Sequence, residues 1–177
     1  MEIVQLIPPR ISLQSEYRQM LTEWKATGED MIPFTLKMNC DDFQDFVVRL
    51  LHAREGIGIP EDFVPHSTYW LVCNKEEKFR IVGAANIRHR LNENLLQIGG
   101  HIGYGVRPSE RKKGYATEIL RRALLICKEN LNLSKVLVTC LKENMVSAKV
   151  IMKNGGILEK EIMYAGKIVQ HYWISDF

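Results

Sequence analysis

The stretch from Gly99 to Leu131 constrains this chain more than any other, because it joins a strand, a basic loop and a long helix in immediate succession. Ile102, Tyr104 and Val106 alternate with glycines, and this period of two predicts a strand. After the loop, apolar residues recur at three- and four-residue spacing, which predicts a half-buried helix. The apolar face of that helix is Ala116, Ile119, Leu120, Ala123, Leu124, Cys127 and Leu131.

The loop between this strand and this helix, Arg111–Thr117, has the composition of an anion-binding site. The first turn of a helix has N–H groups without an intrahelical partner and lies at the positive end of the helix dipole. Gly114 lets the backbone approach a ligand closely, as in helix N-termini that bind phosphate. The alternative is a solvated basic turn that only caps a surface helix.

The segment RKKGYA, residues 111–116, resembles the Arg/Gln-x-x-Gly-x-Gly/Ala loop of the GNAT superfamily of N-acetyltransferases. In those enzymes the loop amides hold the pyrophosphate of acetyl-CoA. The resemblance therefore implies that acetyl-CoA is a co-substrate of this chain. The loop residues that it assigns to cofactor binding are Arg111, Lys112, Lys113, Gly114, Tyr115, Ala116 and Thr117.

Composition narrows the class of protein. The chain has 177 residues, 46% of them apolar, which predicts one domain over residues 1–177 with a hydrophobic core. A formal net charge of +3 suits an anionic cofactor and lies far from the basic extreme of nucleic-acid-binding proteins. The four cysteines form no CxxC pair, so we expect neither a metal site nor a disulfide framework. No apolar run could cross a bilayer and no signal peptide is evident, so we expect a cytoplasmic protein without a membrane partner.

Periodic segments on both sides of the central stretch predict the rest of the fold. Expected strands are residues 2–7, Ser67–Cys73, Phe79–Arg88, Ile102–Val106, Lys135–Leu141, Ile157–Tyr164 and Lys167–Ser175, with one helical turn near 92–97. Expected helices are Ser12–Thr27, a segment from a cap near Cys40-Asp41 to the break at Gly56, Ala116–Leu131, and a segment from a cap at Asn144 to Gly155. The order βααβββαβαββ gives an α/β fold, a mixed central sheet of about seven strands with helices on both faces. It resembles the GNAT fold over essentially the full length.

In GNAT enzymes the strand before the cofactor loop splays away from the next parallel strand, and the pantetheine arm of the cofactor enters the gap. The resemblance places that gap between Ile102–Val106 and Val136–Leu141. It implies that backbone N–H groups near Gly105 and Val106 contact pantetheine and the thioester oxygen, as in other oxyanion holes. The alternative is that Gly103 and Gly105 mark a β-bulge, and both interpretations can hold together.

The segment ENMVSAKVIMKNGGI, residues 143–157, resembles the Asn-x-x-Ser/Ala…Lys-x-Gly-Phe element of the family. There the Asn contacts the cofactor arm, which assigns Asn144 and Ser147 to cofactor binding. Many members carry a tyrosine seven residues after this Asn, proposed to protonate the departing thiolate, but here the position is Ile151. Ser147 is the candidate replacement, as in the ribosomal-protein-acetylating (RimJ/RimL-like) branch that this chain resembles at IGYGV, GYATE and NMVSA, and Cys140 is a candidate assistant. For Asn144 the alternative role is a helix cap, for Ser147 it is an ordinary helix-start hydroxyl, and for Cys140 it is a buried core thiol.

A general base is also needed. A lysine-type amine, with a pKa of about 10.4, must lose a proton before it attacks, whereas an α-amino group, at about 8, needs less help. His101, just upstream of the cofactor strand, is the candidate base, and its alternative role is structural. The basic run Arg88-His89-Arg90, with Asn86, lies at a strand end that often borders the acceptor pocket in this family. It is a candidate site for an acidic acceptor or for the 3′-phosphate of the cofactor. The alternative is that these residues only form an exposed rim.

These observations predict an acetyl-CoA-dependent N-acetyltransferase that acts on a small-molecule or protein amine by direct attack in a ternary complex. The alternative is a catalytically silent GNAT-fold module that binds acyl-CoA as a sensor or interaction domain, which the missing tyrosine keeps open. A Rossmann site is not expected, because Gly103-x-Gly105 is followed by Arg107-Pro108 and not by a helix. No nucleic-acid partner is expected, and a homodimer through the carboxy-terminal hairpin is left open.

Overall fold

The computed structural model describes residues 3–75 and 78–177 of the chain. Its strands are β1 (Ile3–Ile7), β2 (His66–Lys75), β3 (Lys78–Arg88), β4 (Ile102–Val106), β5 (Val136–Leu141), β6 (Ile157–Tyr164) and β7 (Lys167–Ile174). Its helices are α1 (Gln14–Ala26), α2 (Phe43–His52), α3 (Glu93–Gln97), α4 (Tyr115–Leu131) and α5 (Met145–Lys153). Short 3₁₀ turns lie at Ile11–Leu13, Phe34–Lys37, Ala53–Glu55 and Pro108–Glu110. The helical turn expected near residues 92–97 is α3.

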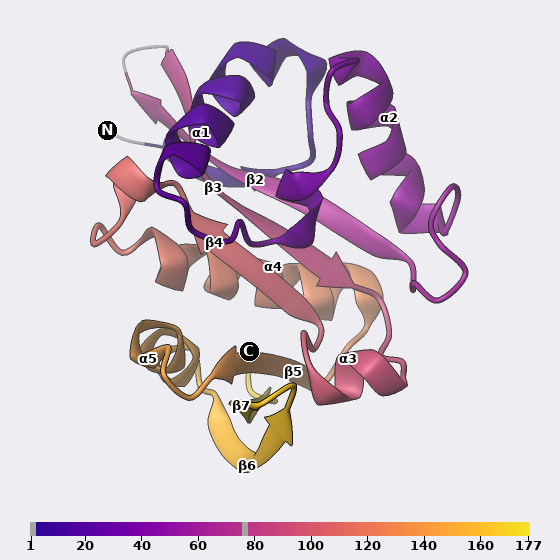
Figure 1. Cartoon of the computed structure of the whole chain (residues 1–177), viewed down its shortest axis with the longest axis vertical. Helices are drawn as coiled ribbons and strands as arrows, with labels where there is room; N and C mark the ends of the chain where they lie inside the picture. The colour runs from indigo at the N-terminus through magenta and orange to yellow at the C-terminus, as the bar shows by residue number, and fades with distance from the viewer. Residues whose placement is uncertain (1–2, 76–77) are drawn as a thin grey trace.

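The strands form two antiparallel sheets, where the sequence predicted one mixed sheet. The first sheet has the order β1-β2-β3-β4 and the second has the order β5-β7-β6. Figure 1 shows the second sheet below the first, and β4 and β5 are the strands that contact each other between the two. At the entrance to β4, the His101 N–H donates to the Leu137 carbonyl at 2.7 Å. No ladder follows between β4 and β5 in the described residues, so the two strands are joined at one end only.

Helices cover both faces of the first sheet, as predicted. α1 and α2 lie on one face and α4 lies on the other (Figure 1). Neighbouring residues of one strand serve the two faces, because side chains alternate along a strand. Trp70 packs in the cluster formed with α1 and α2, whereas Leu71 packs with Ile119 of α4. A third cluster joins α4 and α5 to β5 and β7 and includes Leu120 and Ile151.

The helices begin and end near the expected residues. Asp42, one residue beyond the predicted cap, accepts the Asp45 N–H at 2.9 Å and starts α2. Asn144 accepts the Ser147 N–H at 3.0 Å, which confirms the cap predicted for α5. Gly155 follows α5 in the left-handed conformation, with φ of 86°, as expected for a glycine after a helix C-terminus.

The glycines of β4 do not mark a bulge. The register between β3 and β4 runs without interruption, and the irregular register lies instead between β2 and β3. Gly105 is required because another segment approaches it. A Cβ at this position would collide with the Ile32 carbonyl oxygen and lie 2.7 Å from the Trp24 ring. The bulge interpretation is therefore wrong, and close packing of the segment after α1 explains the glycine.

Arg107, the residue after β4, ties this strand to α1. Its side chain is only 4% exposed, with Nε 2.6 Å from Glu23 Oε2 and one terminal nitrogen 3.2 Å from Glu16 Oε2. The second Glu23 oxygen accepts the Ser109 N–H at 2.5 Å. Burial alone would raise the pKa of Glu23, but the hydrogen bonds from Arg107 and Ser109 outweigh it and lower the pKa to about 2. This network fixes the end of β4 and the start of the basic loop.

Candidate active site

A cavity of about 490 Å³ lies where β4 and β5 separate. Its walls come from the segment around Phe34, the end of β3, both separating strands, the start of α5 and the β6–β7 turn. Predicted site residues in its lining are Arg88, Cys140, Asn144 and Ser147. The structure therefore brings these four together. His101, Gly105, Val106 and the loop Arg111–Thr117 are not among the residues that line it.

The basic loop presents backbone N–H groups at the start of α4. Lys112 and Gly114 have positive φ angles of 64° and 86°, and α4 begins directly afterwards at Tyr115. Within the described residues, the loop N–H groups that donate to no protein atom are those of Lys112, Lys113, Gly114, Ala116 and Thr117. No side chain lies within 4 Å of the position that a Cβ on Gly114 would occupy. The loop thus has the open, donor-rich geometry that a diphosphate requires.

The loop side chains have other partners. Arg111 makes a two-pronged ion pair with Glu29, at 3.0 and 2.5 Å, and lies over the Trp24 ring at 5.7 Å. Lys113 Nζ lies 2.8 Å from the buried carboxylate of Glu110. These carboxylates hold two of the three loop cations in place. The backbone amides, more than the cationic side chains, remain available for an anion.

The hydrogen-bonding pattern of β4 selects which amides face the gap. Arg107 N–H donates to the Val82 carbonyl at 2.9 Å, and bonded pairs alternate with non-bonded pairs in an antiparallel ladder. Gly105, two residues before Arg107, therefore directs its N–H toward β3. Tyr104 and Val106 direct theirs toward β5, where no strand pairs with them in the described part of the chain. Of the two predicted contacts, Val106 has the amide on the open side.

Tyr104 is a site residue that the sequence analysis did not single out. Its hydroxyl lies 3.2 Å from Ser147 Oγ, so β4 and α5 are linked across the gap. Burial raises the pKa of Tyr104 to about 12, although the hydrogen bond to Ser147 acts in the opposite direction. Its period-two position marked it only as part of a strand. A hydroxyl within a glycine-flanked strand beside a proposed cofactor gap is the signal that could have identified it.

Cys140 and Asn144 lie on the same wall as Ser147. Burial raises the pKa of the Cys140 thiol, so the thiol keeps its proton at neutral pH. Its sulfur lies 4.0 Å from Gln170 Oε1. Asn144 uses its side-chain oxygen to cap α5, and its amide NH₂ remains as a donor toward the cavity. The capping role and a contact to a ligand are therefore compatible.

His101 lies at the junction of the two sheets. Its side chain is 5% exposed, and its Nδ1 accepts the Leu137 N–H at 2.9 Å. Burial and the nearby charge of Arg88 lower its pKa to about 4. A neutral imidazole with Nδ1 as acceptor carries its hydrogen on Nε2, so the ring has no second lone pair for a proton. The geometry therefore favours a positioning role over the predicted role as general base.

The fold and the loop agree with the comparison to protein families. A model described as "Acetyltransferase (GNAT) domain" matches residues 13–157. The chain therefore belongs to the GNAT acetyltransferase family. No curated protein sequence matches it. Along residues 3–75 and 78–177, none of the helices has the length and apolar character needed to cross a membrane.

Solved structures share the GNAT fold with this chain. One is RimL, a ribosomal L7/L12 α-N-protein acetyltransferase in complex with coenzyme A, with 16% identity, a TM-score of 0.68, and coverage of 96% of this chain and 92% of that chain. The microcin C7 self-immunity acetyltransferase MccE, in complex with acetyl-CoA and AMP, has 13% identity, a TM-score of 0.67, and coverage of 98% and 92%. A variant of spermidine N-acetyltransferase SpeG from Vibrio cholerae has 14% identity, a TM-score of 0.60, and coverage of 98% and 94%.

Proposed function

We propose that this protein transfers the acetyl group of acetyl-CoA to a primary amine, of a small molecule or a protein, by direct attack in a ternary complex. The observation that carries the proposal is the set of loop N–H groups at the start of α4 that have no protein partner among the described residues. They lie next to a strand gap into which the N–H groups of Tyr104 and Val106 point without pairing to a described strand. Acetyl-CoA would supply the activated acetyl group: the neutral amine forms the C–N bond, the C–S bond breaks, and the proton released from the nitrogen passes to the departing thiolate, directly or through water. Its diphosphate fits the loop amides, and its pantetheine arm fits the gap between β4 and β5.

Val106 and Asn144 would orient the thioester. The Val106 N–H faces the gap and can donate to the thioester oxygen, where negative charge develops during attack. The Asn144 amide can donate to the cofactor arm from the opposite wall. Because both donors are already fixed by the ladder and by the helix cap, little reorganisation is required during the reaction.

Tyr104 and Ser147 would stabilise the departing sulfur. A phenol with a pKa of about 12 keeps its proton at neutral pH, so it can always donate a hydrogen bond. A thiol has a pKa of about 8.5, so full proton transfer from this phenol to a thiolate is unfavourable. We therefore assign Tyr104 to hydrogen-bond stabilisation of the thiolate, together with Ser147. Tyr104 and Ser147 would thus take over the role of the tyrosine that many family members carry at the position of Ile151.

The test is thiol release from acetyl-CoA by the purified chain in the presence of a broad panel of amines. We expect turnover with at least one amine, without a burst of free thiol before the amine is added. A burst equal to the enzyme concentration would indicate an acetyl-enzyme and contradict direct attack. Tight acetyl-CoA binding without turnover across the panel would instead favour the alternative, a silent acyl-CoA-binding module.

A further inference from the structure

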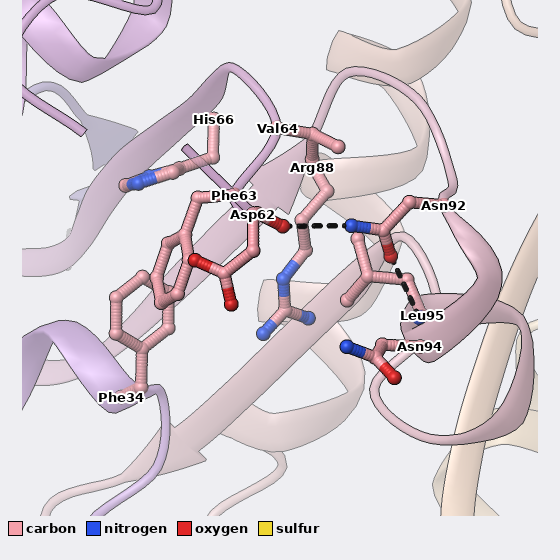
Figure 2. Close-up of a pocket in the computed structure, with 9 residues that line it drawn as sticks. All are labelled: Phe34, Asp62, Phe63, Val64, His66, Arg88, Asn92, Asn94 and Leu95. Carbon is pink, nitrogen blue, oxygen red and sulfur yellow. Dashed lines mark hydrogen bonds between the residues drawn. The ribbon is translucent and has the colours of Figure 1, made fainter. Parts of the chain in front are cut away.

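Arg88, the last residue of β3, lies between two cavities. It lines the cavity of about 490 Å³ at the strand gap and also a smaller pocket of about 140 Å³. Figure 2 shows its guanidinium in the smaller pocket, between the Phe34 and Phe63 rings on one side and the Asn94 amide on the other. The guanidinium therefore reaches the space where an acceptor would approach the acetyl group.

Among the described residues, no carboxylate forms an ion pair with this guanidinium. Its terminal nitrogen donates to the Gly99 carbonyl at 3.2 Å, and the Phe34 ring lies over it at 5.9 Å. Within the described residues, no acidic oxygen lies within 4.0 Å of it, although exposed Asp62 lines the same pocket. Arg107 and Arg111 differ in this respect, because both pair with glutamates. Burial lowers the pKa of Arg88 to about 10.

The chain also makes room for this side chain. A Cβ on Gly103 of β4 would lie 3.3 and 3.5 Å from the two terminal guanidinium nitrogens, so a larger residue would crowd them. The guanidinium thus lies against Gly103 of β4, the residue before Tyr104. This places a planar, two-pronged donor beside the proposed reacting groups.

The charges around the larger cavity disfavour a polycation as the acceptor, and the acidic Asp62 lines only the smaller pocket. The acidic residue in its lining, Asp30, is paired with Lys37 at 2.6 Å. Lys167, also in the lining, lies 3.7 Å from the exposed Glu143. Arg88 therefore leaves the lining with a net positive charge. A polyamine such as spermidine would be repelled, whereas an anionic group would be attracted.

We propose that Arg88 binds a carboxylate of the acceptor, so that the acceptor is an amine that carries a carboxylate close to the acetylated nitrogen. This inference rests on the proposed acetyl transfer. Two sources share this chemistry: the α-carboxylate of a free amino acid, and an acidic side chain next to the amino terminus of a peptide. Phe34, Phe63, Val64 and Leu95 give the small pocket an apolar wall for the part of the acceptor that adjoins the carboxylate.

The first experiment measures binding of reaction products to the CoA-loaded protein by titration calorimetry. One arm uses N-acetyl-L-amino acids and the matching N-acetyl-L-amino acid amides. The other uses N-acetyl dipeptide amides with Asp or Asn in the second position. We expect the carboxylate form to bind about tenfold or more tightly than its amide in one arm, because a charge-assisted pair is lost in the amide.

The matched variants are Arg88→Met, Arg88→Lys and Arg90→Met, where Arg90 is the exposed arginine of the same basic run and lines neither cavity. Arg88→Met should abolish the preference, Arg88→Lys should retain part of it, and Arg90→Met should leave it unchanged. Far-UV circular dichroism checks that each variant is folded. Equal binding of carboxylates and amides to the wild type, no binding of any probe, or an unchanged preference in Arg88→Met would overturn the proposal.

Thiol-release assays with the free amines separate this inference from the proposed function. If carboxylate probes bind through Arg88 but no amine is acetylated, the anion site stands and acetyl transfer falls. If neutral amines are acetylated as efficiently as acidic ones and Arg88→Met makes no difference, acetyl transfer stands and the anion site falls. Preferential acetylation of spermidine would also contradict the charge argument.

Discussion

His101 and Leu137 form a closed pair of hydrogen bonds: the backbone N–H of His101 donates to the Leu137 carbonyl at 2.7 Å, and the backbone N–H of Leu137 donates to Nδ1 of the His101 ring at 2.9 Å. The imidazole takes the place of a backbone acceptor at the point where a strand ladder would otherwise continue. Beyond this pair, β4 and β5 form no ladder with each other in the described part of the chain. His101 therefore both joins the two sheets and ends the pairing between them.

Replacement of His101 should distinguish its two candidate roles. His101→Ala leaves the buried Leu137 N–H unsatisfied and removes a packed ring, so we expect a loss of about 2–4 kcal/mol in the free energy of unfolding in urea. His101→Asn offers an oxygen near the position of Nδ1 and should recover part of this loss and most of kcat. If His101 is the general base, His101→Asn should instead lose activity and the acidic limb of the pH–rate profile, with stability unchanged.

Loss of the Tyr104 hydroxyl should slow the reaction and leave cofactor binding intact. We expect Tyr104→Phe to lower kcat by about tenfold to a hundredfold, because one donor to the developing thiolate is removed. The Kd of acetyl-CoA, measured by calorimetry, should stay within about twofold. Tyr164→Phe is the control, since Tyr164 lines the same cavity and its hydroxyl has no hydrogen-bond partner in the described structure. A similar loss of kcat in both variants would refute the assignment.

A side chain at Gly114 should weaken acetyl-CoA binding specifically. Gly114→Val places a β-branched residue at φ of 86° and in the space that faces the loop amides, so we expect the Kd of CoA to rise by about tenfold or more. Gly58→Val is the matched control, because Gly58 has φ of 71° and equally open surroundings. Both variants should lose similar stability. Unchanged CoA affinity in Gly114→Val would show that the loop does not bind the diphosphate.

Local sequence patterns predicted the strand–loop–helix segment and the helix caps, because these depend on residues close together in the chain. The cap by Asn144 and the left-handed Gly155 follow from their own neighbours. The two-sheet arrangement could not be read in this way. It depends on how the backbone N–H and the imidazole of His101 meet the carbonyl and the N–H of Leu137, 36 residues further along the chain.

The candidate site shows the same division. The loop was recognised from consecutive residues, but the partner of Arg111 is Glu29, 82 positions away, and no local pattern pairs them. Tyr104 and Ser147 are separated by 43 positions and meet only because β4 and α5 flank the same gap. The residue types predicted which side chains could bind the cofactor or act in acetyl transfer. The packing of distant segments decides which of those side chains already pair with other protein groups.

Arg107 should be a strong stabiliser although it lies outside the reaction. Arg107→Met leaves Glu16 and Glu23 without their shared cation, so we expect a loss of about 2–3 kcal/mol in the free energy of unfolding, less than for a fully buried pair because both carboxylates are partly exposed. Arg121→Met is the control, since its exposed pair with Glu118 should contribute at most about 0.5 kcal/mol. Similar losses in both variants would contradict the anchoring role of the Arg107 network.

Stability should fall between pH 6.5 and pH 4 because of two buried histidines. Burial lowers the pKa of His66 and of His101 from 6.5 to about 4, and Arg88 contributes in both cases. Above pH 6.5 both rings are neutral in the folded and the unfolded chain, so stability is independent of their titration. As the pH falls below 6.5, only the unfolded chain gains these protons, and the free energy of unfolding decreases until the folded pKa is reached. We expect a loss on the order of 1–2 kcal/mol for each ring at pH 5.

Glu23 affects stability in a lower pH range than the histidines, so the two contributions to the free energy of unfolding can be separated. The pKa of Glu23 is lowered to about 2, so the stability it contributes is present above pH 4.5 and is lost as the pH falls from about 4.5 to 2. Urea unfolding of the wild type and of His101→Asn at pH 7.5, 6, 5, 4 and 3 measures the histidine contribution. The variant should show a shallower decline between pH 6.5 and 4 and the same decline below it. Parallel curves over the upper window would mean that His101 binds a proton equally well in the folded and unfolded chain, and that its ring does not hold Leu137 as a neutral acceptor.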